Sequence, residues 1–183
     1  VANRRAHVEP GLVNARLGRA VAPHGLRFAP DPASQIAATL GGNVATNAGG
    51  IHVLTYGVMS QHVLAVELMD GAGRIVALVV PGLLLGLLGR VHLLDGRLPE
   101  QGGLDLRGVS VGGEGTLGLV VGAWLRLLPA PPAIGTLLAG FDTLEAAAAT
   151  VGDLVTSERL PDAVELMDAR AIALVEDYAG AGY

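Results

Sequence analysis

Residues 41–50 read Gly-Gly-Asn-Val-Ala-Thr-Asn-Ala-Gly-Gly, and this stretch constrains the fold more than any other part of the chain. Four glycines, two asparagines and a threonine among ten residues leave too little apolar surface to form a core. Glycine lets the backbone adopt a positive φ and approach another group closely. The asparagine, threonine and peptide groups offer neutral hydrogen-bond donors and acceptors. The stretch therefore predicts a loop that holds a flat, polar ligand against the main chain.

Composition narrows the chemistry available around this loop. The sequence contains no cysteine, which excludes thiolate metal sites, iron–sulfur clusters, disulfides and cysteine nucleophiles. All 12 basic residues are arginine, so a phosphate-binding lysine, a Schiff-base lysine and a lysine base are also excluded. A net charge of −5 without a basic cluster argues against a nucleic-acid partner. The histidines do not show ligand spacing, so we expect no metal site.

Hydropathy argues against a membrane span. The longest apolar stretch, residues 75–89, is interrupted by a proline and two glycines. A membrane-spanning helix needs about 20 apolar residues, so this stretch predicts a buried strand and loop. Near the start, Arg4 and Arg5 are not followed by the apolar run of a signal peptide. We therefore expect a cytoplasmic protein.

Periodicity and turn signals predict the elements up to a proline cluster at 129–132, which we take as a domain boundary. Residues 29–60 are expected to be mostly loop and turn, as is typical of a binding segment. The regular elements expected in this part are a strand at 6–11, a helix at 14–21, a hairpin of strands 62–69 and 74–80, and a strand at 117–128.

Beyond the prolines the pattern changes to alternating elements. A strand at 135–141 precedes a helix at 142–158, which Asp142 and Glu145 would open as a capping box. A second strand at 163–167 and a second helix at 168–178 follow. The chain is thus expected to hold one domain and the opening of another.

Two short motifs match well-known fingerprints without their context. Residues 113–118 fit the dinucleotide pattern G-x-G-x-x-G, but a strand-like run follows where that motif needs a helix. Residues 108–112 fit the nucleophile elbow G-x-S-x-G, but all five histidines precede Ser110. The hydrolase fold places its histidine after the serine. A Rossmann site and a hydrolase are both disfavoured.

Several motifs, in order and at natural spacing, resemble the FAD-linked oxidases. Pro30-Asp-Pro-Ala-Ser34, followed by the run from Thr39 to Gly50, is similar to their flavin-binding core. Residues 113–118, followed by a long strand ending in Leu-Pro, are similar to a second signature. The resemblance is to the vanillyl-alcohol-oxidase type, whose FAD domain is called PCMH-type, and within it to the D-lactate dehydrogenase and glycolate oxidase D-subunit family. It covers nearly the whole chain.

The resemblance implies an α+β fold. Residues 1–130 would be the second half of a PCMH-type FAD-binding domain, lacking the N-terminal subdomain whose loop holds the pyrophosphate. Residues 131–183 would be the first βαβα elements of a ferredoxin-like cap domain. The implied activity is that of an FAD-dependent oxidoreductase acting on a CH–OH group, with hydride transfer from C2 of a D-2-hydroxy acid such as lactate or glycolate. No catalytic base can be named.

The same resemblance implies which residues contact FAD, by hydrogen bonds from side chains and main chain. They are Pro30, Asp31, Ser34, Thr39, Gly41, Gly42, Asn43, Thr46, Asn47, Gly49, Gly50, Glu114, Gly115 and Thr116.

Two histidines and a tyrosine near the loop leave alternatives open. His52 and His62 are read as neutral, hydrogen-bonding side chains, although one of them could contact or attach to the flavin. Tyr56, which with Gly57 matches a pair common in the family, is either a packing residue at a turn or a cofactor contact.

The chain also departs from the family pattern, so a second hypothesis stands beside the enzyme. Because both ends look short, the chain resembles an internal fragment. The segment 81–103 is longer and more apolar than the connection that the family has at this place. It is either a true insertion or out-of-frame sequence. The alternative is a non-catalytic, truncated or decayed copy, or a subunit that needs a second polypeptide to bind FAD.

Overall fold

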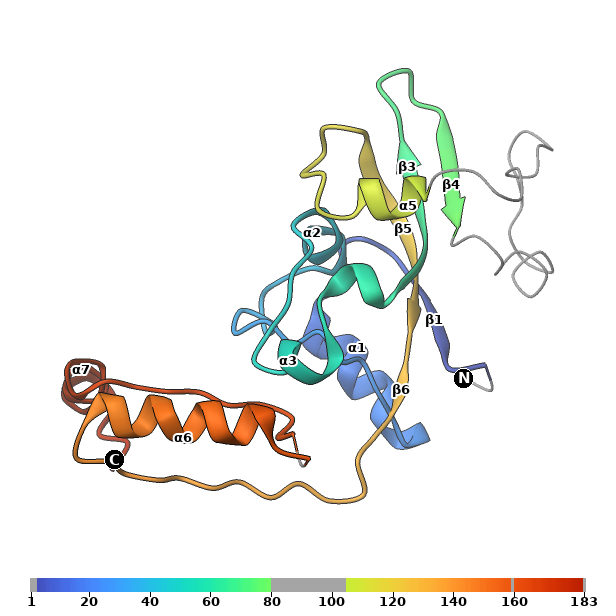
Figure 1. Cartoon of the computed structure of the whole chain (residues 1–183). Coiled ribbons are helices and arrows are strands. Elements are labelled where there is room, and N and C mark those ends of the chain that lie inside the picture. The colour runs from blue at the N-terminus through green and yellow to red at the C-terminus, as the bar shows by residue number, and fades with distance from the viewer. Residues whose placement is uncertain (1–2, 80–104, 159, 183) are drawn as a thin grey trace. The chain divides into compact units, whose positions relative to one another are not determined.

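The structure is a computed structural model that describes residues 3–79, 105–158 and 160–182 (Figure 1). The chain divides into two compact units, Val1–Pro132 and Ala133–Tyr183. The stretch 81–103, which the sequence marks as an insertion or out-of-frame segment, lies outside the described residues.

A four-stranded antiparallel sheet is the centre of the first unit. Its strands are β1 (Arg5–Val8), β5 (Leu119–Arg126), β3 (Val63–Met69) and β4 (Ile75–Val79), in the order β1-β5-β3-β4. The predicted hairpin is confirmed as β3 and β4, which pair antiparallel from Met69 and Ile75 onward. Strand β5 lies between β1 and β3, so the sheet joins an early segment of the chain to a late one.

The turn of the hairpin is held by one aspartate. Asp70 Oδ1 accepts the backbone N–H groups of Ala72 and Arg74, and Asp70 Oδ2 accepts from the Arg74 guanidinium. Gly73 has a φ of 76°, which a side chain would disfavour. The Asp-Gly-Ala-Gly sequence therefore forms the turn that its composition predicts.

Helices packed with the sheet complete the core of this unit (Figure 1). Helix α1 (Asn14–Val21) contributes Leu17 and Val21, and helix α2 (Leu40–Ala45) contributes Leu40 and Val44. A short helix η1 (Ala22–His24) leads from α1 to strand β2 (Leu26–Arg27), which pairs with β6 (Leu128–Pro129). The sheet contributes to this core cluster Val8, Val63, Val66, Leu68, Val120, Ala123 and Leu125.

Three more short helices complete the first unit. They are α3 (Val53–Tyr56), η2 (Met59–Gln61) and α5 (Leu106–Ser110). The segment 29–60, expected to be mostly loop, thus contains α2, α3 and η2 between its turns. Helix α5 begins after Asp105, whose carboxylate accepts the N–H of Gly108 at 2.9 Å.

The second unit contains helices α6 (Leu144–Thr156) and α7 (Ala169–Ala179). Each has a side-chain N-cap: Thr143 accepts from Ala146 N–H, and Asp168 accepts from Ala171 N–H. The two helices lie where the sequence predicts them, although Thr143 rather than Asp142 is the cap. None of the described residues from 133 to 182 is buried.

The strands predicted at 135–141 and 163–167 are wrong, since the structure assigns no regular element to either segment. A strand is stabilised by hydrogen bonds to a neighbouring strand. The sequence pattern of a strand does not reveal whether a partner is available. Within the described part of the chain, no helix is both long and apolar enough to cross a membrane.

Candidate functional site

The first half of the glycine–asparagine stretch is helical rather than looped. Thr39 is the N-cap of α2, and its Oγ1 accepts the N–H of Gly42 at 3.2 Å. Thr46 lies at the other end of this helix, and its Oγ1 donates to the carbonyl oxygen of Gly42 at 3.0 Å. Both threonine hydroxyls, expected at FAD, therefore have hydrogen bonds within the segment itself.

Two glycines of the stretch are required by close approaches within the protein. A Cβ on Gly41 would lie 2.5 Å from Pro10 Cβ, and a Cβ on Gly50 would overlap Asp31. The backbone at these positions is therefore pressed against neighbouring segments. From the sequence we expected these glycines to let the backbone approach a ligand. In the structure the backbone at Gly41 and Gly50 instead approaches protein residues, Pro10 and Asp31.

The two predicted flavin-binding segments lie side by side. The N–H of Gly112 donates to Val44 O at 2.9 Å, and the N–H of Glu114 donates to Ala45 O at 2.9 Å. Glu114 has a φ of 48°, a left-handed conformation that is uncommon outside glycine. These bonds place the exposed turn of Glu114, Gly115 and Thr116 against the end of α2.

Asp31 joins the Pro-Asp-Pro turn to the end of the glycine stretch. Its Oδ2 lies 2.5 Å from Nδ1 of His52, and both side chains are mostly buried. Its other oxygen, Oδ1, is buried without a hydrogen-bond partner among the described residues. Because Gly50 also packs against Asp31, this carboxylate, His52 and the second glycine pair form one cluster.

The two asparagines of the stretch have different surroundings. Asn47 has a φ of 49°, and its Oδ1 accepts the N–H of Ser60 at 2.8 Å. Asn43 is 3% exposed, and within the described part of the chain its Nδ2 has no hydrogen-bond partner. One amide is therefore used by the fold, while the other keeps a buried donor unpaired.

Tyr56 is in contact with a cation. The guanidinium carbon of Arg27 lies 4.1 Å from the centre of the Tyr56 ring, a cation–π geometry. The Tyr56 and His52 rings are 6.3 Å apart. Sequence reasoning did not single out Arg27, because nothing local connects it to a tyrosine on another element.

His62 is held in the core beside this cluster. Its Nε2 lies 2.7 Å from Tyr56 O, and its Nδ1 is buried without a partner among the described residues. Burial is the main cause that lowers the pKa of His62, and the charge of Arg126 lowers it further against the opposing hydrogen bond to Tyr56. His62 is therefore neutral, as the sequence predicted.

Three further residues predicted to contact FAD, Pro30, Gly49 and Ser34, have different surroundings. Pro30 is fully buried, and its carbonyl oxygen accepts from Asn14 Nδ2 at 2.9 Å. Gly49 packs closely against the side chain of Val53. Ser34 is exposed in a turn.

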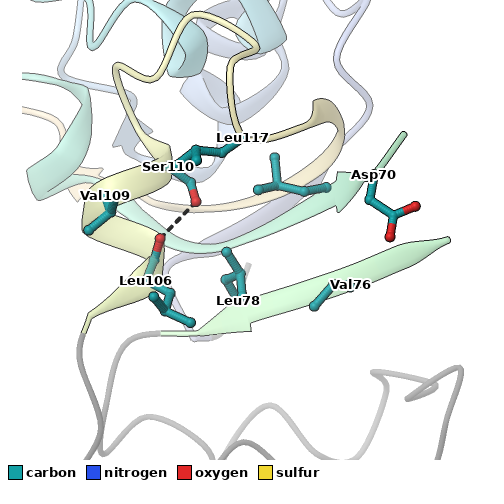
Figure 2. Close-up of a pocket in the computed structure, with 8 residues that line it drawn as sticks. Asp70, Val76, Leu78, Leu106, Val109, Ser110 and Leu117 are labelled. Atoms are coloured by element: carbon teal, nitrogen blue, oxygen red, sulfur yellow. Dashed lines mark hydrogen bonds between the residues drawn. The ribbon is translucent and has the colours of Figure 1, made fainter. Parts of the chain in front are cut away.

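An apolar pocket of about 250 Å³ lies between the hairpin and α5 (Figure 2). Its two polar side chains are already engaged: Asp70 binds Arg74, and Ser110 Oγ donates to Leu106 O at 2.7 Å. The lining residues are Leu68, Asp70, Val76, Leu78, Leu106, Val109, Ser110 and Leu117. None of the predicted flavin contacts lines it, so it is distinct from the polar site. Across the described ranges, no group of three histidine or acidic side chains could hold a metal ion.

Known protein families match both parts of the chain. The FAD binding domain family matches residues 1–78, and the C-terminal domain family of FAD linked oxidases matches residues 130–182. The glycolate oxidase subunit GlcD of Escherichia coli K12 is 40% identical over 98% of this chain and 33% of its own length. The D-lactate dehydrogenase of Archaeoglobus fulgidus is 34% identical over 97% of this chain and 36% of its own length. The chain spans about a third of the length of the curated relatives that it matches.

The fold of this chain is also similar to that of a solved structure. An alkyldihydroxyacetonephosphate synthase matches 88% of this chain and 26% of its own, with a TM-score of 0.66. At 21% sequence identity this likeness concerns the fold alone.

Proposed function

Because this chain belongs to the FAD-linked oxidases, we propose that the Pro-Asp-Pro turn, the glycine–asparagine stretch and the turn at 114–116 hold FAD. The observation that carries this proposal is the pair of backbone hydrogen bonds from Gly112 and Glu114 to Val44 and Ala45. They bring two segments far apart in sequence, each predicted to contact flavin, to one place.

One polar group of the glycine–asparagine stretch and one of the Pro-Asp-Pro turn fit FAD. Asn43 Nδ2 is a donor and Asp31 Oδ1 is an acceptor, and the described protein leaves both unpaired. A buried polar group without a partner is costly. The isoalloxazine ring carries carbonyl acceptors and an N–H donor, which are the complementary groups. We assign Asn43 and Asp31 as the side chains that contact the ring. The exposed turn at 114–116 would contact FAD through its main chain.

The proposed reaction is oxidation of a D-2-hydroxy acid such as glycolate or D-lactate, in line with the names of the relatives. When bound, FAD supplies the acceptor for the hydride that leaves C2 of the substrate. The residues of this chain bind and orient the cofactor. We assign none of the described residues as the base that removes the proton from the substrate hydroxyl.

A second candidate function, a non-catalytic chain or a subunit that needs another polypeptide, is favoured by the second unit. Apolar side chains are strongly exposed there, including Leu137 at 89% and Leu138 at 72%. Exposed apolar surface of this kind is typical of an interaction site. We propose that residues 131–183 belong to a cap domain that packs against further protein, and that residues 1–130 are the FAD-binding part.

Absorbance of the purified chain separates the two candidates. If the chain is an independent oxidoreductase, added FAD will stay bound through gel filtration, and D-lactate or glycolate will bleach the flavin bands. An Asn43→Leu variant should lose the bound flavin, whereas Asn3→Leu, at an exposed position, should keep it. A wild-type chain that stays colourless with excess FAD would rule out the independent enzyme. Recovery of binding on adding a second polypeptide would support the subunit hypothesis.

A further inference from the structure

Arg107 lies at the centre of a network that reaches the predicted flavin site. Its side chain is 12% exposed, and its guanidinium binds Asp105 through Nη2 and Oδ2 at 2.6 Å. Nη1 of Arg107 also donates to Ser60 O at 2.5 Å and to Val63 O at 2.9 Å. This mostly buried guanidinium thus has one acceptor on each of two other segments, Ser60 in η2 and Val63 in β3, and a carboxylate at the start of its own helix. Because the guanidinium is planar, these contacts fix its orientation.

The network continues from Ser60 to the glycine–asparagine stretch. The backbone of Ser60 makes both contacts: its carbonyl oxygen accepts from Arg107, and its N–H donates to Asn47 Oδ1 at 2.8 Å. Asn47 in turn lies against Gly112, where an added Cβ would be 3.1 Å from Asn47 Cβ. Gly112 follows α5, the helix that carries Arg107.

These contacts form a closed ring. The main chain runs from Arg107 through α5 to Gly112, whose N–H donates to Val44 O. From Val44 the stretch leads to Asn47, and from Asn47 the hydrogen bonds return through Ser60 to Arg107. Each member of the ring therefore restrains the distance between the glycine–asparagine stretch and the turn at 114–116.

We infer that Arg107 and Asn47 are positioning residues that set the spacing of the two halves of the flavin site through the backbone of Ser60. This inference rests on the proposed FAD function. It changes the role expected for Asn47, whose side-chain oxygen is used by the fold rather than by the ligand. Asp105 supports the ring, because its hydrogen bonds to Arg107 hold the guanidinium in place.

The test compares variants of the full chain that keep or remove the acceptor for Ser60 N–H. Asn47→Asp keeps an oxygen at this place, whereas Asn47→Ala removes it. Arg107→Lys keeps a donor near Ser60 O, whereas Arg107→Ala removes it. Arg16→Ala, at an exposed position in α1, is the matched control. The two readouts are the hydrogen-exchange rate of the Ser60 amide without ligand and titration with FAD followed by fluorescence and visible absorption.

We expect Asn47→Ala to speed exchange of the Ser60 amide by about fivefold or more, since the lost hydrogen bond from Ser60 N–H contributes about 1 kcal/mol. Arg107→Ala should also speed this exchange, because it removes the donor that holds the carbonyl oxygen of the same residue. FAD should bind about tenfold more weakly to both, and its absorption band at saturation should differ from the wild-type band. Asn47→Asp and Arg16→Ala should stay close to the wild type in each readout. Arg107→Lys should lie between the wild type and Arg107→Ala, because lysine keeps a donor but not the planar fork of donors.

Two results would overturn the inference. If Asn47→Asp weakens FAD binding as much as Asn47→Ala while Ser60 exchange is unchanged, the Asn47 amide contacts FAD directly. If both alanine variants keep wild-type exchange at Ser60, the ring does not exist in solution. A wild-type chain that fails to bind FAD would instead refute the proposed function, and the exchange rates would still decide whether the ring is present.

Discussion

His62 Nε2 donates to the carbonyl oxygen of Tyr56 across 2.7 Å, and this bond fixes which nitrogen of the imidazole carries the proton. The other nitrogen, Nδ1, is left buried with no partner among the described residues. A second proton would place an unpaired charge in the core, at 3% exposure of the residue. The bond therefore keeps a neutral histidine between the end of α3 and the start of β3.

The first prediction concerns acid stability. Burial lowers the pKa of His62 below its ordinary value of 6.5, so the unfolded chain binds this proton at a higher pH than the folded one. The contribution of neutral His62 to the free energy of unfolding is therefore fully present above about pH 6.5, and it is lost as the pH falls toward the lowered pKa. In His62→Gln, the free energy of unfolding should fall less between about pH 7 and pH 5 than in the wild type. Urea unfolding at a series of pH values measures this, with the exposed His24→Gln as a control; equal slopes for His62→Gln and wild type would contradict it.

The second prediction concerns Gly41. An added Cβ meets Pro10 Cβ at 2.5 Å, so Gly41→Ala should lower the free energy of unfolding by about 1–3 kcal/mol. Gly18→Ala is the matched control, because nothing lies within 4 Å of its added Cβ and the residue is inside α1. That control should raise stability by up to about 1 kcal/mol through helix propensity. Chemical denaturation of both variants decides; destabilisation of similar size in both would refute the specific contact.

The third prediction separates ligand binding from folding at Gly50. A Cβ on this residue would overlap Asp31, and Gly50→Ala should therefore shift the carboxylate away from His52. We expect at least tenfold weaker FAD binding by fluorescence titration. Gly11→Ala, with no atom within 4 Å of its added Cβ, should bind FAD as the wild type does. Unchanged affinity in Gly50→Ala would show that Asp31 is not part of the flavin site.

The fourth prediction concerns the cap of α2. Thr39→Val removes the oxygen that accepts Gly42 N–H while it keeps nearly the same shape, so it should cost about 1 kcal/mol of stability. Thr39→Ser keeps the oxygen and should cost much less. Thermal unfolding of the two variants measures the difference. If Thr39→Ser destabilises the protein as much as Thr39→Val, packing of the methyl group is more important than the cap.

Local signals predicted the elements that depend on local interactions. The hairpin of β3 and β4 was predictable because Asp70 and Gly73 supply turn chemistry between two apolar runs. Helix α1 was predictable because Leu17 and Val21 share one face. The strand expected at 135–141 is absent because a strand also needs a neighbour, and a sequence pattern does not contain that information.

The candidate site was predicted in composition but not in its internal contacts. The sequence marked the glycines of the stretch for close approach, and Gly41 does approach another group, which is Pro10. The role of Arg107 was not predictable, because, besides the nearby Asp105, its acceptors are carbonyl oxygens of Ser60 and Val63, on segments far away in the sequence. Any residue type offers the same carbonyl group, so no side-chain pattern points to such a bond.

The central place of β5 in the sheet has a consequence for biosynthesis. Strand β5 pairs with β1 and β3, and both of these leave the ribosome before β5 is made. Until then the nascent chain exposes the apolar faces of its earlier segments, and contacts between distant segments form slowly. The glycine–asparagine stretch also cannot form its hydrogen bonds to Gly112 and Glu114 until those residues have been synthesised. A ribosome-bound chain that ends before β5 should therefore depend on chaperones and be unable to capture a cofactor.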